Sequence, residues 1–292
     1  MPNVRIGISG WNYAGWRGVF YPPGLPHRRE LEYASRRLGS IEINGSFYSL
    51  QTPSSYRRWH EQTPPDFVFA LKGSRFITHM KKLADVRVPL ANFLASGVLL
   101  LREKLGPILW QFPERFSFRG AMAERLAAFL ELLPTTTTAA AALAAEHDAR
   151  LTGRAWTEAD AHRPLRHALE IRHASFLSAE VVGLLRRHGV ALVFADTAGR
   201  WPYAEEVTAP FVYLRLHGSR HLYASGYTDA ELDWWAARIR AWTGGSQPPD
   251  RVRIPGCPPP PRTRRDAYVY FDNDARVHAP FDALRLAERL AG

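Results

Sequence analysis

Eight short apolar segments occur along the chain, most of them followed by an amphipathic segment, and this alternation constrains the fold more than any other feature. The apolar segments are typical of buried strands, and the amphipathic ones have the period of helices that cover a sheet. The predicted strands cover residues 4–10, 40–48, 67–73, 106–112, 167–174, 191–197, 211–218 and 267–273. The predicted helices cover residues 29–39, 54–62, 88–102, 120–133, 178–188, 228–242 and 280–290.

Eight strand–helix units are the number that closes a (β/α)₈ barrel. We therefore predict an α/β fold, in which residues 1–292 form a single domain, a TIM-type (β/α)₈ barrel. An open doubly wound sheet is the alternative. It is less favoured because no Gly-x-Gly-x-x-Gly sequence follows a predicted strand, so the usual dinucleotide-binding motif is missing.

Two stretches lie outside the alternation. Threonines 135–138 precede an alanine-rich run that ends at Leu151, and this pattern predicts an extra helix between units four and five, because threonine often caps a helix. Residues 255–265 contain four consecutive prolines followed by basic residues. They predict an extended surface loop that leads to the last strand.

Composition limits the partners and the location. The net charge of +10 and the pI near 10.0 favour anionic partners, but the arginines are dispersed, so we expect nucleic-acid binding to be at most weak. Cys257 is the only cysteine, which excludes an intramolecular disulfide and favours the cytoplasm. No apolar run approaches the roughly 20 residues of a membrane span, so no membrane partner is expected.

Charged and polar side chains gather near the carboxyl ends of the predicted strands, where barrels of this type carry their sites. On one face of a strand, Glu170 and Arg172 share a parity opposite to the apolar Leu169 and Ile171. We predict three catalytic residues: Glu42, Lys72 and Glu170. We predict that eight further residues bind the substrate: Trp11, Asn44, Tyr48, Gln111, Arg172, Arg215, His217 and Asn273.

Each candidate has a chemical reason. A lysine among arginines resists protonation, so Lys72 is a candidate base or Schiff-base nucleophile, although binding of an anion is the favoured role. Glu42 or Glu170 would transfer a proton. Trp11 and Tyr48 would offer a stacking surface for a base or a sugar. The alternative is that the charged residues form an internal lattice of ion pairs that only fills the barrel.

No cofactor is predicted, but a divalent metal is possible. The side chains that could ligate it are His79, His173, His217, Glu42, Glu170, Asp196 and Asp272. The signal is weak, because no His-x-His or His-Glu-x-x-His sequence is present.

Motifs along almost the whole chain resemble the YecE-like proteins, a family of uncharacterised function. They are Gly7-Ile8-Ser9-Gly10-Trp11, Glu42-Ile43-Asn44-Gly45-Ser46-Phe47-Tyr48, Phe69-Ala70-Leu71-Lys72-Gly73-Ser74, Gln111-Phe112-Pro113, Glu170-Ile171-Arg172-His173, Tyr213-Leu214-Arg215-Leu216-His217-Gly218 and Tyr270-Phe271-Asp272-Asn273. The resemblance implies a TIM-type barrel and no particular reaction. The family commonly has Phe-Asn-Asn where this chain has Phe271-Asp272-Asn273, so the resemblance does not imply a required carboxylate at position 272.

Three hypotheses for function follow from these patterns. The first is an enzyme, a hydrolase or a lyase, that acts on a small phosphorylated or nucleotide-like anion by general acid–base chemistry. The second is a metal-dependent phosphodiesterase that cleaves DNA or RNA. The third is a protein that binds a nucleotide or nucleic acid without catalysis. The fold alone does not choose among them, and the oligomeric state is not predicted.

Overall fold

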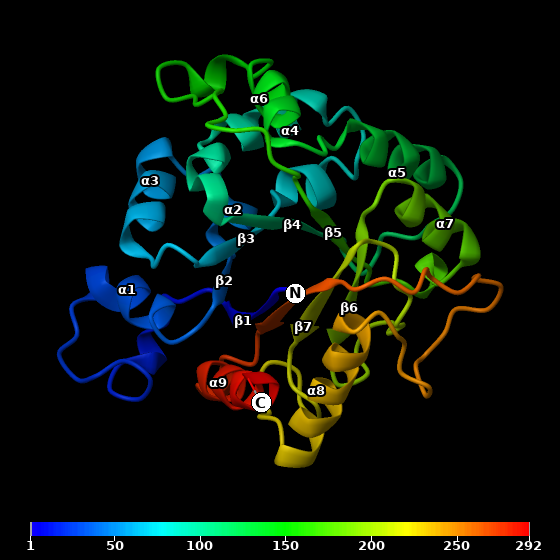
Figure 1. Ribbon diagram of the computed structural model, residues 1–292. Helices are drawn as coiled ribbons and strands as arrows, with labels where there is room; N and C mark the ends of the chain where they lie inside the picture. The colour runs from blue at the N-terminus through cyan, green and yellow to red at the C-terminus, as the bar shows by residue number, and fades with distance from the viewer. Residues whose placement is uncertain (1, 292) are drawn as a thin grey trace.

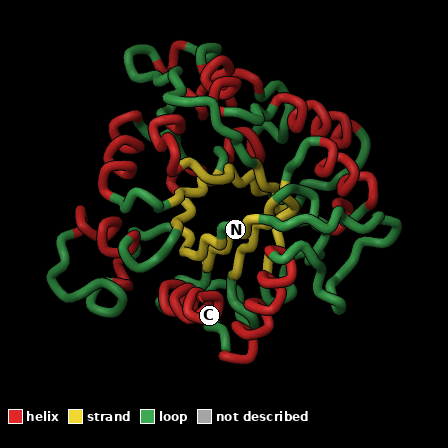
Figure 2. The backbone as a smooth tube through the Cα atoms, in the orientation of Figure 1, coloured by secondary structure: helices red, strands yellow, loops and turns green. Residues whose placement is uncertain are grey.

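Eight parallel strands pair in sequence order, and the last pairs with the first, which closes the predicted barrel. We describe residues 2–291 from a computed structural model, in which the strands form a central ring inside a layer of helices (Figures 1 and 2). The strands are β1 Val4–Ser9, β2 Ser40–Ile43, β3 Val68–Lys72, β4 Leu105–Gln111, β5 His167–Glu170, β6 Ala191–Asp196, β7 Phe211–Leu216 and β8 Asp266–Phe271. The α-helices are α1 Glu30–Ser35, α2 Gly45–Tyr48, α3 Pro53–Gln62, α4 Arg87–Ala95, α5 Ala121–Leu132, α6 Thr137–Ala144, α7 Ala179–Arg187, α8 Asp229–Thr243 and α9 His278–Ala291.

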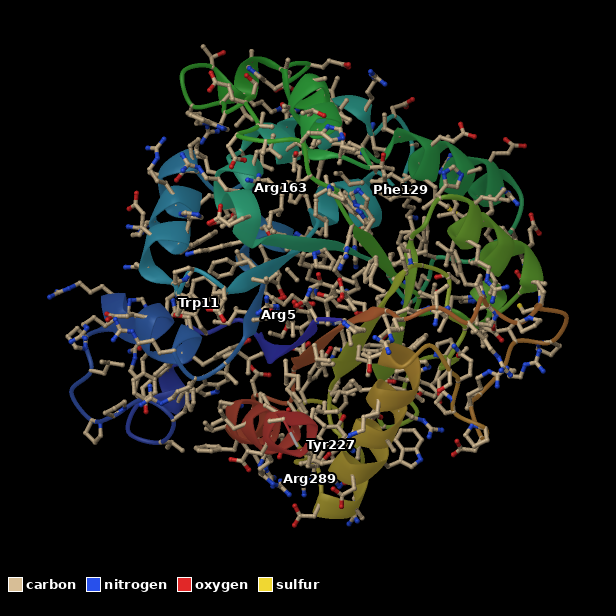
Figure 3. All side chains as sticks on the ribbon, viewed as in Figure 1. Arg5, Trp11, Phe129, Arg163, Tyr227 and Arg289 are labelled. Carbon is tan, nitrogen blue, oxygen red and sulfur yellow. The ribbon has the colours of Figure 1, made fainter. Side chains whose placement is uncertain are left out.

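Strand residues of alternating parity build two separate cores. Those that point outward, such as Phe69, Trp110 and Leu214, pack against the helices in the larger core. Those that point into the ring form a smaller core, in which alanines leave room for the large rings of Tyr213 and Tyr270. Figure 3 shows side chains filling the inside of the ring. The barrel is therefore packed inside, and its inward parity continues toward the polar residues at the strand ends.

The second strand is shorter than predicted. It ends at Ile43, and Gly45–Tyr48 turns into the short helix α2 instead of continuing the strand to residue 48. The Ser46 hydroxyl donates to the backbone oxygens of Ile43 at 3.0 Å and of Lys72 at 2.7 Å. A hydrogen-bonding serine near a strand end thus offers the backbone a turn in place of the ladder. The fifth strand also ends early, at Glu170 rather than at residue 174.

The predicted helix over residues 88–102 is two helices. The first, α4, ends at Ala95, and a 3₁₀ segment begins at Val98. Gly97 lies between them with a φ of +115°, a conformation that favours glycine and ends a helix. The apolar periodicity runs through this break because both segments bury side chains in the same core.

The extra helix between units four and five is confirmed as α6. Its N-cap is Thr136, whose hydroxyl oxygen accepts a hydrogen bond from the backbone N–H of Ala139 at 3.2 Å. Residues 249–265 contain no helix or strand, as predicted for the proline-rich loop. Within residues 2–291, the helices are all too short or too polar to cross a membrane.

Candidate functional site

Arg215 of β7 lies at the centre of a buried polar cluster at the carboxyl end of the barrel. Its guanidinium donates to Glu42 of β2 through Nε at 3.1 Å and Nη2 at 2.9 Å, and to Glu170 of β5 through Nη1 at 2.7 Å. It also donates to Asp272, after β8, at 2.8 Å. Arg215, Glu42 and Glu170 are all 0% exposed. The cluster therefore brings together, inside the protein, side chains from strands that are far apart in the sequence.

Glu42 is held on every side by hydrogen-bond donors. Besides Arg215, the hydroxyls of Ser9 and Tyr213 donate to its carboxylate at 2.5 and 2.6 Å. Ser9 in turn accepts from the Asn44 amide at 3.0 Å, so Asn44 joins the cluster. A carboxylate held in this way is fixed in position, and its lone pairs are occupied.

Glu170 connects the cluster to the rim of the barrel through Arg172. The Nε of Arg172 donates to Glu170 at 2.7 Å, and its Nη2 donates to the side-chain oxygen of Gln111 at 2.9 Å. The Arg172 guanidinium also stacks over the ring of Trp201 at 3.6 Å. Burial alone would raise the pKa of Glu170, but Arg172 and Arg215 outweigh this effect, and the pKa lies well below its usual range. Glu170 is therefore ionised.

His217 and Asp272 extend the cluster on the side of β7 and β8. The Nε2 of His217 lies 3.2 Å from Nη1 of Arg215, and its Nδ1 lies 3.0 Å from Oδ2 of Asp272. Because a guanidinium only donates, Nε2 is the acceptor in this contact, and Nδ1 is the ring nitrogen that faces the carboxylate. Burial would raise the pKa of Asp272, but Arg215 and His217 lower it to about 2.

Lys72, at the end of β3, differs from the other charged residues of the cluster in its pairing and its pKa. Its Nζ lies 4.3 Å from the centre of the Phe47 ring, and among residues 2–291 no carboxylate forms an ion pair with it. Burial and then the charge of Arg215 lower its pKa to about 8. Near neutral pH Lys72 thus exchanges protons easily, which is the property that a base or an amine nucleophile needs.

The charges of the cluster nearly cancel. Glu42, Glu170 and Asp272 carry three negative charges, whereas Arg172 and Arg215 carry two positive ones. Protonated Lys72 makes the sum zero. Lys72 thus balances the charge of the cluster, although its amine forms no ion pair within it.

A cavity of about 570 Å³ opens beside Arg172. Its charged walls are Arg172, Arg200, Arg220 and Glu114, and Trp201 and Tyr223 supply aromatic surface. Arg172 pairs with Glu170 and Arg200 with Glu114, whereas Arg220 pairs with no carboxylate among residues 2–291, so the cavity favours anions through Arg220. Arg172 belongs both to the cavity and to the buried cluster, which links the two.

Three predicted binding residues do not contact the cluster. The Trp11 ring, labelled in Figure 3, packs edge-on against Trp59 at 5.5 Å. Tyr48 is 65% exposed, and the guanidinium of Arg75 lies 5.5 Å from the centre of its ring. Asn273 is buried, and its amide donates to Asp282 and to the backbone oxygen of Ser225, both at 2.9 Å. Asn273 thus ties the loop after β8 to α9.

The possible metal ligands do not gather. In the part of the chain that the structure describes, no three histidine, cysteine, aspartate or glutamate side chains are arranged to hold an ion. The guanidinium of Arg215 lies between the three carboxylates, in the place that a cation would need. His173 instead caps a 3₁₀ turn by accepting from the backbone N–H of Ser175, and Asp196 accepts from the Tyr227 hydroxyl.

Four contributors to the site are absent from the predicted catalytic and binding residues. Tyr213 and Ser9 have the inward parity of Arg215 and Glu42, so strand periodicity is sufficient to find them. Asp272 is predicted only as a possible metal ligand, because the YecE-like proteins commonly have asparagine there, yet it binds Arg215. Trp201 lies in the long connection after β6, and no periodic signal marks it.

A family profile described as "Protein of unknown function DUF72" matches residues 5–292. The chain belongs to the DUF72 family. Among solved structures, a DUF72 family protein of Thermotoga maritima superposes with a TM-score of 0.76 over 99% of this chain and 100% of its own, at 24% identity. A DUF72 family protein of Enterococcus faecalis superposes with a TM-score of 0.72 over 99% of this chain and 96% of its own, at 16% identity. At these identities the superpositions support the barrel fold alone.

Two curated relatives of this DUF72 chain match part of its sequence. YecE of Escherichia coli is 30% identical over 131 residues, which are 45% of this chain and 44% of YecE. YunF of Bacillus subtilis is 28% identical over 124 residues, which are 39% of this chain and 41% of YunF. The matches thus span less than half the length of each relative. Both are UPF0759 proteins, so the predicted YecE-like family is confirmed.

Proposed function

We propose that the chain is an enzyme that acts on a small anionic substrate by general acid–base chemistry at the carboxyl end of the barrel. The cavity beside Arg172 would bind the anion, and Lys72 would transfer the proton. Glu42 and Glu170 hold Arg215 and Arg172 in place, a role that differs from the proton transfer predicted for them, because both carboxylates are occupied by donors.

The observation that carries the proposal is the unpaired amine of Lys72 beside a cluster whose other charges are paired. A buried amine without a direct ion pair costs stability. Burial of such a group is common at catalytic sites, where a pKa near neutrality serves proton transfer. Arg220, which lines the cavity and forms no ion pair among residues 2–291, supports an anionic substrate.

The proposal is tested by anion binding and by turnover. Phosphate and sulfate are expected to raise the melting temperature above that in chloride of equal ionic strength. Arg220→Ala, which removes an exposed guanidinium from the cavity, should reduce this effect, whereas Arg119→Ala, at an exposed position that does not line the cavity, should leave it unchanged. No difference between phosphate and chloride would overturn the anionic substrate.

Turnover is then sought in a panel of phosphorylated and carboxylated metabolites. Lys72→Met is expected to abolish any activity found while it retains the response to phosphate. Full activity in Lys72→Met would remove Lys72 from the chemistry. A clear anion effect without turnover of any compound would favour the binding protein over the enzyme.

A further inference from the structure

The chain contains two buried lysines, and they differ in the hydrogen bonds that Nζ makes. The Nζ of Lys104 donates to the backbone oxygens of His60 and Thr63 at 2.6 and 2.8 Å and to the Thr63 hydroxyl at 3.2 Å. It uses all three donors to hold the end of α3, as a structural lysine does. Lys72 is also buried, yet among residues 2–291 its Nζ has no such partner.

The surroundings of Lys72 suit a nucleophile better than an anion-binding cation. The nearby carboxylates are engaged by Arg215 and Arg172 and form no ion pair with the amine, so their charges offset only part of the fall in its pKa. The Phe47 ring lies against Nζ and excludes water from one side. With a pKa of about 8, about a tenth of the amine is neutral at pH 7, against less than a thousandth of an ordinary lysine. Only the neutral amine attacks carbon.

We propose that Lys72 forms an imine with its substrate, which makes the substrate an aldehyde or ketone that also carries a phosphate or a carboxylate. This inference rests on the proposed function, because it names the substrate class for the same site. The carbonyl group would meet Nζ, and the anionic group would reach the cavity by way of Arg172, which lines the cavity and donates to Glu170, a carboxylate whose charge acts on Lys72.

The reaction balances without any other reactant. The lone pair of Nζ forms a bond to the carbonyl carbon, and the carbonyl π electrons move to oxygen, which takes up a proton and becomes a hydroxyl. That hydroxyl then leaves as water, and the nitrogen lone pair forms the C=N bond. From the ammonium form, the products are one protonated imine and one water, with no net gain or loss of protons. Glu170 is ionised and held by Arg172 and Arg215, so water, rather than this carboxylate, carries the proton from nitrogen to oxygen.

The small number of lysines makes the inference easy to test. The chain has four, namely Lys72, Lys81, Lys82 and Lys104. The full chain is incubated at pH 7 with glycolaldehyde phosphate and sodium cyanoborohydride, which reduces an imine to a stable secondary amine. Peptide mass spectrometry then reads the adduct at each lysine. We expect the adduct on Lys72 at least tenfold faster than on Lys82, which lies nearer the surface.

Variants distinguish a specific imine at Lys72 from nonspecific labelling of lysines. Lys72→Arg and Lys72→Met should lose the main adduct, and their melting temperatures establish that they fold. Arg220→Ala should slow labelling by glycolaldehyde phosphate at least threefold but leave labelling by neutral glycolaldehyde unchanged. Labelling of Lys82 as fast as Lys72 would overturn the imine.

The outcomes also distinguish this inference from the proposed function. If phosphate stabilises the chain but Lys72 is not labelled, the imine is wrong and the anion-binding enzyme stands. If Lys72 is labelled equally by the neutral and the phosphorylated aldehyde and phosphate has no effect, the imine stands and the anionic substrate is wrong. If neither effect is found, both proposals fail.

Discussion

At the scale of single residues, the buried cluster predicts unequal costs for two similar substitutions. Glu170→Gln leaves Arg172 and Arg215 facing a neutral amide in a buried place, so we expect it to lower the free energy of unfolding by roughly 3–5 kcal/mol. Asp272→Asn keeps an oxygen for Arg215, which retains both glutamates, and should cost only about 1 kcal/mol. Urea denaturation of the two variants measures the difference, and equal costs would contradict a cluster centred on Arg215.

The lowered pKa of Lys72 predicts a pH dependence of stability. Because its pKa is about 8 in the folded chain and 10.5 for an unperturbed lysine, the unfolded chain holds more protons between these pH values. The buried charge of Lys72 therefore lowers the free energy of unfolding most below pH 8, and this loss of stability disappears as the pH rises toward 10.5. Relative to Lys72→Met, the wild type should gain up to about 3 kcal/mol between roughly pH 7 and pH 10. The measurement is urea denaturation of both proteins at each pH; a constant difference would mean that the pKa is normal.

At the scale of helices and strands, the break between α4 and the 3₁₀ segment predicts that substitution of Gly97 is destabilising. A Cβ at Gly97 would lie 2.7 Å from the Cα of Pro53 and 2.9 Å from the Tyr56 ring, and its φ is +115°. Gly97→Ala should therefore cost more than about 3 kcal/mol, from crowding and backbone strain together.

Gly153→Ala is the matched control for this prediction. Gly153 also has a positive φ, +73°, but no atom lies within 4 Å of the place that a Cβ would occupy there. The substitution should cost about 1 kcal/mol from backbone strain alone. Equal melting temperatures for the two variants would show that crowding by α3 is unimportant.

The periodicity of the sequence is sufficient to predict the elements but not all of their ends. The strand at 211–216 is predicted within two residues, because its outward Leu214 and inward Arg215 alternate clearly. The end of β2 is not predicted, since Phe47 and Tyr48 have strand-forming side chains while the hydrogen bonds of Ser46 that make the turn involve Lys72, on another strand. Local patterns do not contain such contacts.

At the scale of the whole molecule, the positive charge predicts weak binding to nucleic acid. Several arginines are paired within the fold, as Arg285 and Arg289 are with Asp229, so few are free to meet phosphates at once. We expect a dissociation constant of about 10⁻⁴ to 10⁻⁶ M for a strand of about 20 nucleotides, and a steep loss of affinity between roughly 50 and 200 mM salt. Fluorescence anisotropy measures both. Nanomolar binding at the higher salt concentration would instead favour a nucleic-acid substrate.

The candidate site is predictable where it depends on strand parity and not where it depends on loops. Glu42, Lys72, Gln111, Glu170 and Arg215 meet because their strands are parallel and their parity is inward. The cavity is not predictable, because Trp201 and Tyr223 lie in long connections whose course follows from tertiary packing. The ion pairs within the cluster are not predictable either. The sequence shows which charged residues are present, but not which carboxylate each arginine pairs with.

The central position of Arg215 has a consequence for how the chain folds during synthesis. Glu42 and Arg215 are separated by 173 residues, so at roughly 5–20 residues per second the ribosome makes the carboxylate about 10–35 s before its counter-ion. During that interval Glu42 has no guanidinium to neutralise it, and we expect the early strands to stay open to water. Stalled nascent chains that end before β7 should thus be cleaved rapidly by protease, whereas chains released after β8 should resist it. We therefore expect the barrel to close as one late event, without a persistent folded intermediate of its first half.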